Sequence, residues 1–108
     1  MLFRSADDYE VVVAADVFTY VGALDAAIRD CFKVLKAGGW LFFSCESAAE
    51  DGADFVLSKN MRYAHATTYV KRLLATDGFA AVTIDPIDLR VENDIAVPGY
   101  IVSAQKPK

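Results

Sequence analysis

The stretch "YEVVVAADVFTYV", residues 9–21, decides the fold class. All residues from Val11 to Ala15 are apolar, and an acid, Asp16, follows them directly. A strand with one face in water alternates apolar and polar residues, and this segment does not alternate. We therefore predict that Tyr9–Ala15 is a strand buried on both faces. Strands of this kind lie in the interior of parallel sheets, so the sequence predicts an α/β protein.

The next segments complete a β-α-β unit. Apolar residues recur at spacings of four, three and four, which is one face of an amphipathic helix. They are Leu24, Ile28, Cys31 and Leu35. We expect Lys33 and Lys36 in the last turn of this helix, where the helix dipole favours cations, and Gly38–Gly39 as its left-handed stop. Residues 40–46, "WLFFSCE", then predict a second apolar strand, joined to the first by a right-handed crossover.

The following part of the chain predicts a loop and a second helix. Residues 47–64 show neither a helical nor a strand period, so we expect a loop there. The helix comes next and ends at Gly78, because apolar residues share one of its faces. They are Ala66, Tyr69, Val70, Leu73 and Leu74.

A terminal β-hairpin is predicted from residue 79 onward. A strand at about 79–90 changes its apolar phase across Asp85–Pro86, which predicts a β-bulge at that point. Pro86 also favours an edge position, because proline cannot donate to the sheet ladder. Residues 91–99, "VENDIAVPG", have the composition of a hairpin connection, and residues 99–106 form the final strand.

Composition limits the classes of function. The 108 residues make one domain, 1–108, and 55% of them are hydrophobic, as in globular proteins. The net charge of −4 is spread along the chain, which argues against nucleic acid or anionic membrane as the main partner. No signal peptide or membrane-spanning run is recognisable, so we expect a cytoplasmic protein. Cys31 and Cys45 lie in apolar surroundings and lack metal-type spacing, so we interpret them as reduced core residues.

Three segments resemble the class I S-adenosylmethionine-dependent methyltransferases. Residues 9–47 look like the fourth strand, fourth helix and fifth strand of that family. Within them "VLKAGGWLFF", residues 34–43, matches the common Pro-Gly-Gly pattern before the fifth strand, with Ala37 in place of proline. Residues 62–79, "RYAHATTYVKRLLATDGF", are similar to the next helix, especially in methyltransferases associated with tetratricopeptide repeats.

The resemblance implies a partial Rossmann-like sheet with strands corresponding to 4, 5, 6 and 7, parallel core strands and an antiparallel C-terminal hairpin. It covers about residues 9–106 and only half of the family domain. The glycine-rich cofactor loop of the missing half has no counterpart, since no Gly-x-Gly-x-Gly occurs in the sequence. We expect the chain to be the C-terminal portion of a methyltransferase domain, with residues 1–8 left from a connection to strand three. Its origin as a fragment, a shortened reading frame or half of a split enzyme stays open.

The resemblance also implies a cofactor side. Ala15, Asp16 and Phe18 follow the first strand, and in open α/β sheets ligands lie beyond the carboxyl ends of the strands. We predict that these residues border S-adenosylmethionine in the complete domain, and that Tyr20 lies on the substrate side. The alternatives are that Asp16 only caps a turn and that the two aromatic residues only pack.

Further candidates follow the second strand and precede the second helix. Glu46 is a candidate to accept a substrate proton, against the alternative of a solvated loop acid. His65 is a candidate base, because histidine titrates near neutrality, against the alternative of a residue that packs and hydrogen-bonds locally. Arg62 and Tyr63 precede it and are predicted to contact substrate. We expect no metal, since a lone histidine without matched ligand spacing is not a metal site.

Two hypotheses of different class follow. In the first, the chain is part of an enzyme that transfers a methyl group from S-adenosylmethionine to a small molecule whose identity the sequence does not predict; methyl transfer depends mainly on alignment of donor and acceptor. In the second, the chain alone is inactive and associates with a second copy through the exposed edge of its first strand, residues 11–15. Pairing with a separately encoded N-terminal half is a third possibility.

Overall fold

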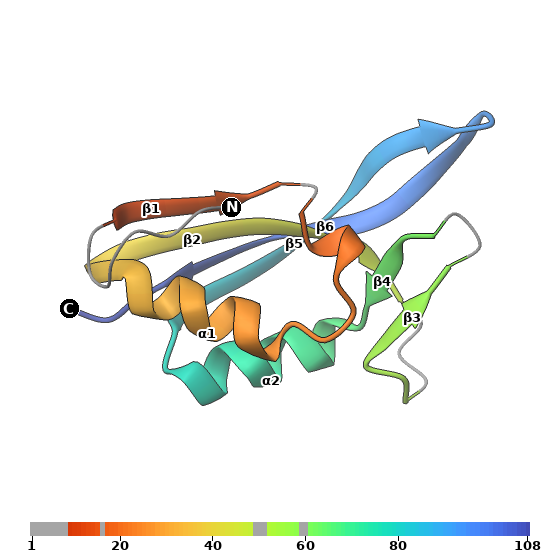
Figure 1. Cartoon of the computed structure of the whole chain (residues 1–108). Coiled ribbons are helices and arrows are strands. Elements are labelled where there is room, and N and C mark those ends of the chain that lie inside the picture. Colours follow the sequence, from red (N-terminus) through yellow and green to blue (C-terminus); the bar gives the residue numbers. More distant parts are fainter. Residues whose placement is uncertain (1–8, 16, 49–51, 59–60) are drawn as a thin grey trace.

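The computed structural model describes residues 9–15, 17–48, 52–58 and 61–108. One mixed sheet is covered on one face by two helices, with a short 3₁₀ helix, η1, after the first strand (Figure 1). The elements in chain order are β1 Tyr9–Ala14, η1 Phe18–Tyr20, α1 Asp25–Val34, β2 Leu35–Ser47, β3 Phe55–Leu57, β4 Tyr63–His65, α2 Thr67–Asp77, β5 Ala80–Glu92 and β6 Ile95–Gln105.

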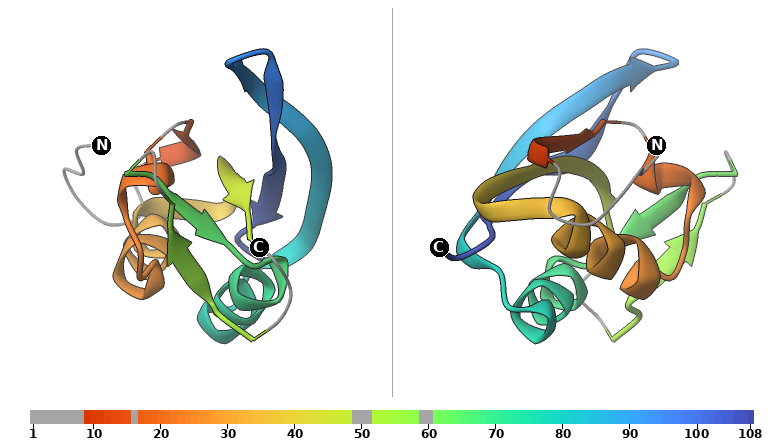
Figure 2. Two further views of the ribbon diagram at one scale, coloured as in Figure 1. Left: turned by 90° about the vertical axis from the view of Figure 1, so that its right-hand side faces the viewer. Right: turned by 60° about the vertical axis from the view of Figure 1, so that its left-hand side comes forward.

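Strand β2 is the centre of the sheet. It pairs in parallel with β1 and, nearer its carboxyl end, with β4, while β6 runs antiparallel along its other edge. The strand order is β3-β4-β2-β6-β5, with β1 beside β2, so β5 is an edge strand. The predicted parallel β-α-β unit and antiparallel terminal hairpin are confirmed, as is the edge position of Pro86. The two further views show that β5 and β6 continue past the sheet as a projecting arm (Figure 2).

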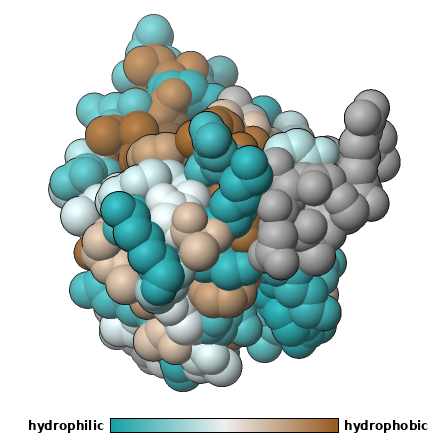
Figure 3. All heavy atoms as spheres, turned by 90° about the vertical axis from the view of Figure 1, so that its left-hand side faces the viewer, coloured by the Kyte–Doolittle hydropathy of each residue, from teal (hydrophilic) through white to brown (hydrophobic). Residues whose placement is uncertain are grey.

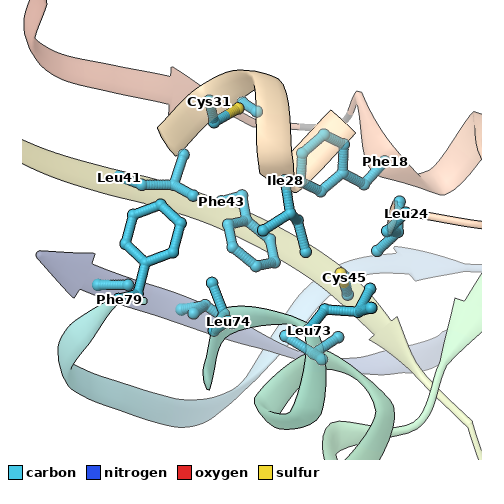
Figure 4. Packing of buried hydrophobic residues seen from close by; sticks show 14 of the residues in the cluster. Phe18, Leu24, Ile28, Cys31, Leu41, Phe43, Cys45, Leu73, Leu74 and Phe79 are labelled. Atoms are coloured by element: carbon cyan, nitrogen blue, oxygen red, sulfur yellow. The ribbon is translucent and has the colours of Figure 1, made fainter. Parts of the chain in front are cut away.

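The hydrophobic core lies between the sheet and the two helices (Figure 4). The predicted apolar faces of both helices are confirmed, because every residue predicted to lie on these faces is buried. Side chains of β2 enter the same layer from the other side. They are Leu41, Phe43 and Cys45. Cys31 and Cys45 are free and buried, as predicted.

Among the residues that the structure describes, no helix lies over the opposite face of the sheet (Figures 1 and 2). For β1 this corrects the prediction of burial on both faces: Val12 and Ala14 are buried, but Val11 is 51% and Val13 is 61% exposed. Burial on both faces of a strand requires a second covering layer, which the described residues do not supply. In the space-filling view, strongly hydrophobic atoms gather toward the top, whereas the lower part mixes hydrophilic and weakly hydrophobic residues (Figure 3).

The boundary between α1 and β2 differs from the prediction. The helix ends at Val34, and Leu35 already pairs with Tyr9 of β1, so Lys36 lies outside the helix. Gly38 is left-handed, with φ +85°, but it lies within β2, where the pairing with β1 shifts register. A side chain on the neighbouring Gly39 would lie only 2.9 Å from the carbonyl oxygen of Lys36. The two glycines therefore shape the entry into β2 and do not stop the helix.

The segment predicted as a loop, residues 47–64, contains β3 and the start of β4. These two short strands pair with each other, and β4 also pairs with the end of β2. Pairing with a distant strand overrides the weak local pattern, so the prediction was wrong for residues 55–57 and 63–64.

The register of the terminal hairpin also corrects two predictions. Pairing between β5 and β6 continues unbroken across Asp85 and Pro86, and the irregularities lie at Ala80/Thr83 and Asp88/Arg90. The connection is the tight turn at Asn93 and Asp94, both with positive φ, as in type I′ hairpin turns. Gly99 belongs to β6, where a side chain would lie 2.5 Å from the carbonyl oxygen of Cys45.

Candidate functional site

The carboxyl end of β1 carries the residues predicted to border the cofactor. Ala15 is exposed in the turn after the strand, and Asp16 lies outside the described residues. Phe18 is only 1% exposed, and its ring packs against Phe43 of β2 at a centroid distance of 4.9 Å. Tyr20 is exposed at the other end of η1. The structure therefore places Phe18 in the core beneath this edge and leaves Ala15 and Tyr20 accessible.

Glu46 lies at the carboxyl end of β2 and is buried, so its interpretation as a solvated loop acid was wrong. Its Oε2 accepts a hydrogen bond from the Arg90 guanidinium of β5. Arg90 also donates from Nε to Glu92 Oε1, and the same oxygen accepts from Arg62 Nη1 at 3.0 Å. Two arginines and two glutamates thus form one chain of ion pairs. We call these residues, Glu46, Arg90, Glu92 and Arg62, the ion-pair chain.

The ion-pair chain links three elements at one end of the sheet: β2, β5 and the start of β4. Burial lowers the pKa of Arg90, but hydrogen bonds and the charges of Glu92 and Glu46 outweigh it and hold that pKa above its usual value. The two positive and two negative charges balance. Both Glu46 and Arg62, predicted to act on substrate, are therefore engaged by other protein groups.

His65 ends β4 and is completely buried. Its Nε2 lies 2.8 Å from the carbonyl oxygen of Val21 and 3.0 Å from that of Gly22. Its Nδ1 is buried and has no hydrogen-bond partner among the described residues. Burial lowers its pKa, although the two carbonyls and the charge of Glu46 act in the opposite direction. The structure favours the packing alternative, with the difference that the hydrogen bonds are long-range and not local.

Aromatic rings surround this imidazole. Tyr69 stacks on it at an interplanar angle of 9°, and Phe55 of β3 contacts both rings. Phe55 also packs edge-on against Tyr63, so Tyr63 is part of the aromatic cluster. A side chain on Gly22 would lie 2.7 Å from the Phe55 ring, which shows how closely the backbone after η1 packs on this cluster.

Sequence reasoning missed Arg90, Glu92, Tyr69 and Gly22 as members of this region. Arg90 and Glu46 are separated by 44 positions, and so are Tyr69 and its partner Asp25. No local spacing connects residues so far apart. The one available signal was the clustering of charge in "LRVE", residues 89–92, next to the hairpin turn.

The uncovered face of the sheet holds a shallow apolar hollow of about 330 Å³. Its lining comes from β1, β2, β5 and β6 and includes Val13, Ala15, Phe42, Ser44, Ile87 and Ile101. Ala15 thus connects the hollow to the carboxyl end of β1.

The described residues contain neither a candidate metal cluster nor a helix suited to span a membrane. No group of three or more His, Cys, Asp or Glu side chains lies close enough together there to hold a metal ion. Over the same part of the chain, neither length nor apolar character would allow any helix to cross a membrane.

Comparison with solved structures gives the fold. A Methanosarcina mazei protein described as a SAM-dependent methyltransferase superposes with a TM-score of 0.70 at 18% identity, over 99% of this chain and 63% of that one. Phosphoethanolamine N-methyltransferase 2 of Haemonchus contortus gives 0.75 at 11% identity, over 99% and 35%. A putative methyltransferase of Bacillus halodurans gives 0.72 at 13% identity, over 100% and 68%. The chain has a methyltransferase fold.

This likeness is one of structure, since the identities are low. No family model and no curated protein sequence matches the chain. The chain spans between about a third and two thirds of the length of these three solved proteins. The predicted α/β class with a partial Rossmann-like sheet is confirmed.

Proposed function

We propose that the chain is the C-terminal portion of an S-adenosylmethionine-dependent methyltransferase domain, which in complete form transfers a methyl group to a small molecule. One observation carries the proposal. Strand β1 is parallel to β2 in a methyltransferase fold, yet among the described residues it has no neighbour on its other edge. Its Val11 and Val13 are exposed on the uncovered face. A strand of this composition belongs in the interior of a sheet.

The residues present fit one edge of a cofactor site. The carboxyl end of β1, with Ala15 accessible and Phe18 fixed in the core beneath it, is where ligands lie in open α/β sheets. We assign Ala15, Asp16 and Phe18 to the cofactor side and the exposed Tyr20 to the substrate side. When bound, S-adenosylmethionine supplies the methyl group as an electrophilic carbon. The described residues offer no glycine-rich loop for it, so the site needs further chain.

The remaining candidates divide by their contacts. Arg62 and Glu46 belong to the ion-pair chain, so in this proposal they set the position of β4 and β5 near the substrate. Tyr63 contributes through its ring in the aromatic cluster. A base role for Glu46 or His65 stays a prediction; it requires that Arg90 release Glu46, or that the buried Nδ1 of His65 become accessible.

Calorimetric titration with S-adenosylmethionine tests the proposal. The chain is measured alone and fused to the part of the Methanosarcina mazei methyltransferase that the superposition leaves uncovered. We expect no heat from the chain alone and micromolar binding, about −8 kcal/mol, by the fusion. The matched control is the fusion with Asp16→Ala, which should bind more weakly. A fusion that unfolds cooperatively but binds no S-adenosylmethionine would contradict the proposal.

A second candidate function, self-association, rests on the same free edge. Backbone groups on the outer edge of β1 offer a template for another strand. Antiparallel pairing of two copies about a two-fold axis at Val12 would set Val11 of each copy opposite Val13 of the other. Glu10 would then face Ala14, so no like charges oppose one another. We propose this homodimer for the chain when no other strand occupies the edge.

Light scattering at tens of micromolar chain tests the dimer. We expect the wild type to be a dimer and Val13→Lys to be a monomer, because a charge on this edge blocks pairing. The matched control is Ala75→Lys, which adds the same charge at an exposed position of helix α2 and should leave the dimer intact. A wild-type monomer at this concentration would rule the dimer out.

A further inference from the structure

Two side chains, one from β4 and one from α2, hydrogen-bond the connection between η1 and α1. His65 of β4 hydrogen-bonds the carbonyl oxygens of Val21 and Gly22. The Tyr69 hydroxyl of α2 accepts from the backbone N–H of Leu24 at 2.9 Å and donates to Asp25 at 2.9 Å. Every residue of this connection that these side chains contact lies 43 to 45 positions away along the chain. The attachment is therefore tertiary.

The contacts of His65 determine its tautomer. Both partners of Nε2 are carbonyl oxygens, which can only accept, so Nε2 carries the hydrogen. Nδ1 then has a lone pair and no hydrogen in the neutral ring. That lone pair is buried and unpartnered among the described residues. The single N–H of a neutral ring has acceptors here, whereas a protonated ring would present a second N–H without one.

We propose that His65 is a positioning residue whose neutral ring holds η1 and the connection after it in place, and that proton uptake at Nδ1 releases them. If the proposed function holds, release of η1 would also move Phe18 and Tyr20, which belong to the candidate cofactor and substrate sides. This consequence rests on the proposed function. The attachment itself does not depend on that function. This role differs from that of a general base, because Nε2 is already used as a donor and Nδ1 is enclosed among the described residues.

The groups that face the imidazole explain why protonation is unfavourable. From β2 comes Glu46, whose charge is compensated by Arg90. From α2 comes Tyr69, with Asp25 of α1 beyond it, and from β4 and β3 come Tyr63 and the apolar Phe55. Among the described groups, the charge that acts to raise the pKa of His65 is that of Glu46, and Arg90 pairs with this carboxylate.

The sign of the pH effect follows from burial. The pKa of His65 is lowered in the folded state, so the opened or unfolded state binds the proton more strongly. The stabilisation by the neutral ring is therefore fully present above the pKa of free histidine, about 6.5, and is lost as the pH falls below it. The window extends from about 6.5 down to the lowered pKa of His65 in the folded state. Within it, opening of the connection should increase by up to about tenfold for each pH unit.

Hydrogen exchange of the chain, followed by mass spectrometry from about pH 5 to 8 and corrected for intrinsic rates, tests the proposal. For the peptide covering residues 18–25 we expect wild-type protection to fall up to about tenfold per pH unit below about 6.5. His65→Gln keeps an amide donor near Nε2 but cannot titrate, so its protection should not change with pH. His65→Ala should lose protection at every pH. A peptide covering residues 80–87 is the internal control.

Two results would overturn the proposal. One is a wild-type pH dependence equal to that of His65→Gln. The other needs no variant: nitrogen NMR of the wild-type ring near neutral pH must show hydrogen on Nε2 and none on Nδ1, and the reverse tautomer would exclude the hydrogen bonds described. None of these experiments contains S-adenosylmethionine. Failure of this proposal is therefore distinguishable from failure of cofactor binding by the fusion.

Discussion

Replacing Arg90 with methionine tests the ion-pair chain most directly. The substitution keeps much of the length and apolar volume of the arginine stem and removes the guanidinium. Glu46, whose side chain is 7% exposed, then loses its main counterion, because the hydrogen bond from Arg90 ends on its Oε2. A buried carboxylate without a partner keeps the full cost of its lost hydration.

The expected loss is about 2–4 kcal/mol of unfolding free energy. Removing one member of a buried ion pair typically costs about 3–5 kcal/mol. The lower range applies here because the Arg90 side chain is 23% exposed, so water replaces part of the lost interaction. For a domain of this size the melting temperature should fall by about 10–20 °C. Glu46→Gln should cost only about 1 kcal/mol, because Arg90 keeps its bond to Glu92 and a hydrogen-bond acceptor at position 46.

Urea unfolding of wild type, both single variants and the double variant completes a double-mutant cycle. We expect Arg90→Met to cost much less in the Glu46→Gln background, which gives a coupling of about 2 kcal/mol. Additive losses, or equal losses from the two single variants, would show that the ion pair does not govern the stability of this region.

Three further predictions concern the core and the backbone. Leu74→Ala should cost about 3 kcal/mol in urea unfolding, because Leu74 is fully buried between α2 and the sheet; a loss below about 1 kcal/mol would contradict this packing. Gly22→Ala should cost about 1–2 kcal/mol, since the new methyl group would lie 2.7 Å from the Phe55 ring, and unchanged stability would refute that contact. Iodoacetamide at about pH 8 should modify Cys31 and Cys45 slowly unless the chain is denatured, because burial raises the pKa of each thiol to about 12.

The sequence predicted those parts of the fold that have a local period. The apolar faces of α1 and α2 were predictable because buried residues recur at every turn of each helix. The helix end at Gly78 was predictable because glycine is favoured in the left-handed position after a helix, and its observed φ is +98°. The parallel pairing of β1 with β2 followed from their uninterrupted apolar runs and the helix between them.

The errors have a common physical cause, which is that pairing partners far along the chain set the local structure. Residues 55–57 and 63–65 become strands because β2 offers a free edge beyond the end of β1. Leu35 leaves the helix because it pairs with Tyr9. The phase change around Pro86 did not require a bulge, because β5 is a largely exposed edge strand and need not bury one continuous face.

In the candidate site, too, positions set by the local sequence were predictable, and contacts with residues far along the chain were not. Ala15, Phe18 and Tyr20 were predicted from the family resemblance and from their position after the first strand. The structure leaves Ala15 and Tyr20 accessible at that edge. The roles of Glu46 and His65 could not be predicted, because their partners Arg90 and Val21 are 44 positions away. Both polar side chains are held by protein groups, so the described chain presents no free base near the end of β2. This favours, for the proposed methyl transfer, a site that acts by aligning donor and acceptor: an acceptor that must lose its proton would have to lose it to water, to the cofactor-side residues or to the further chain that completes the site.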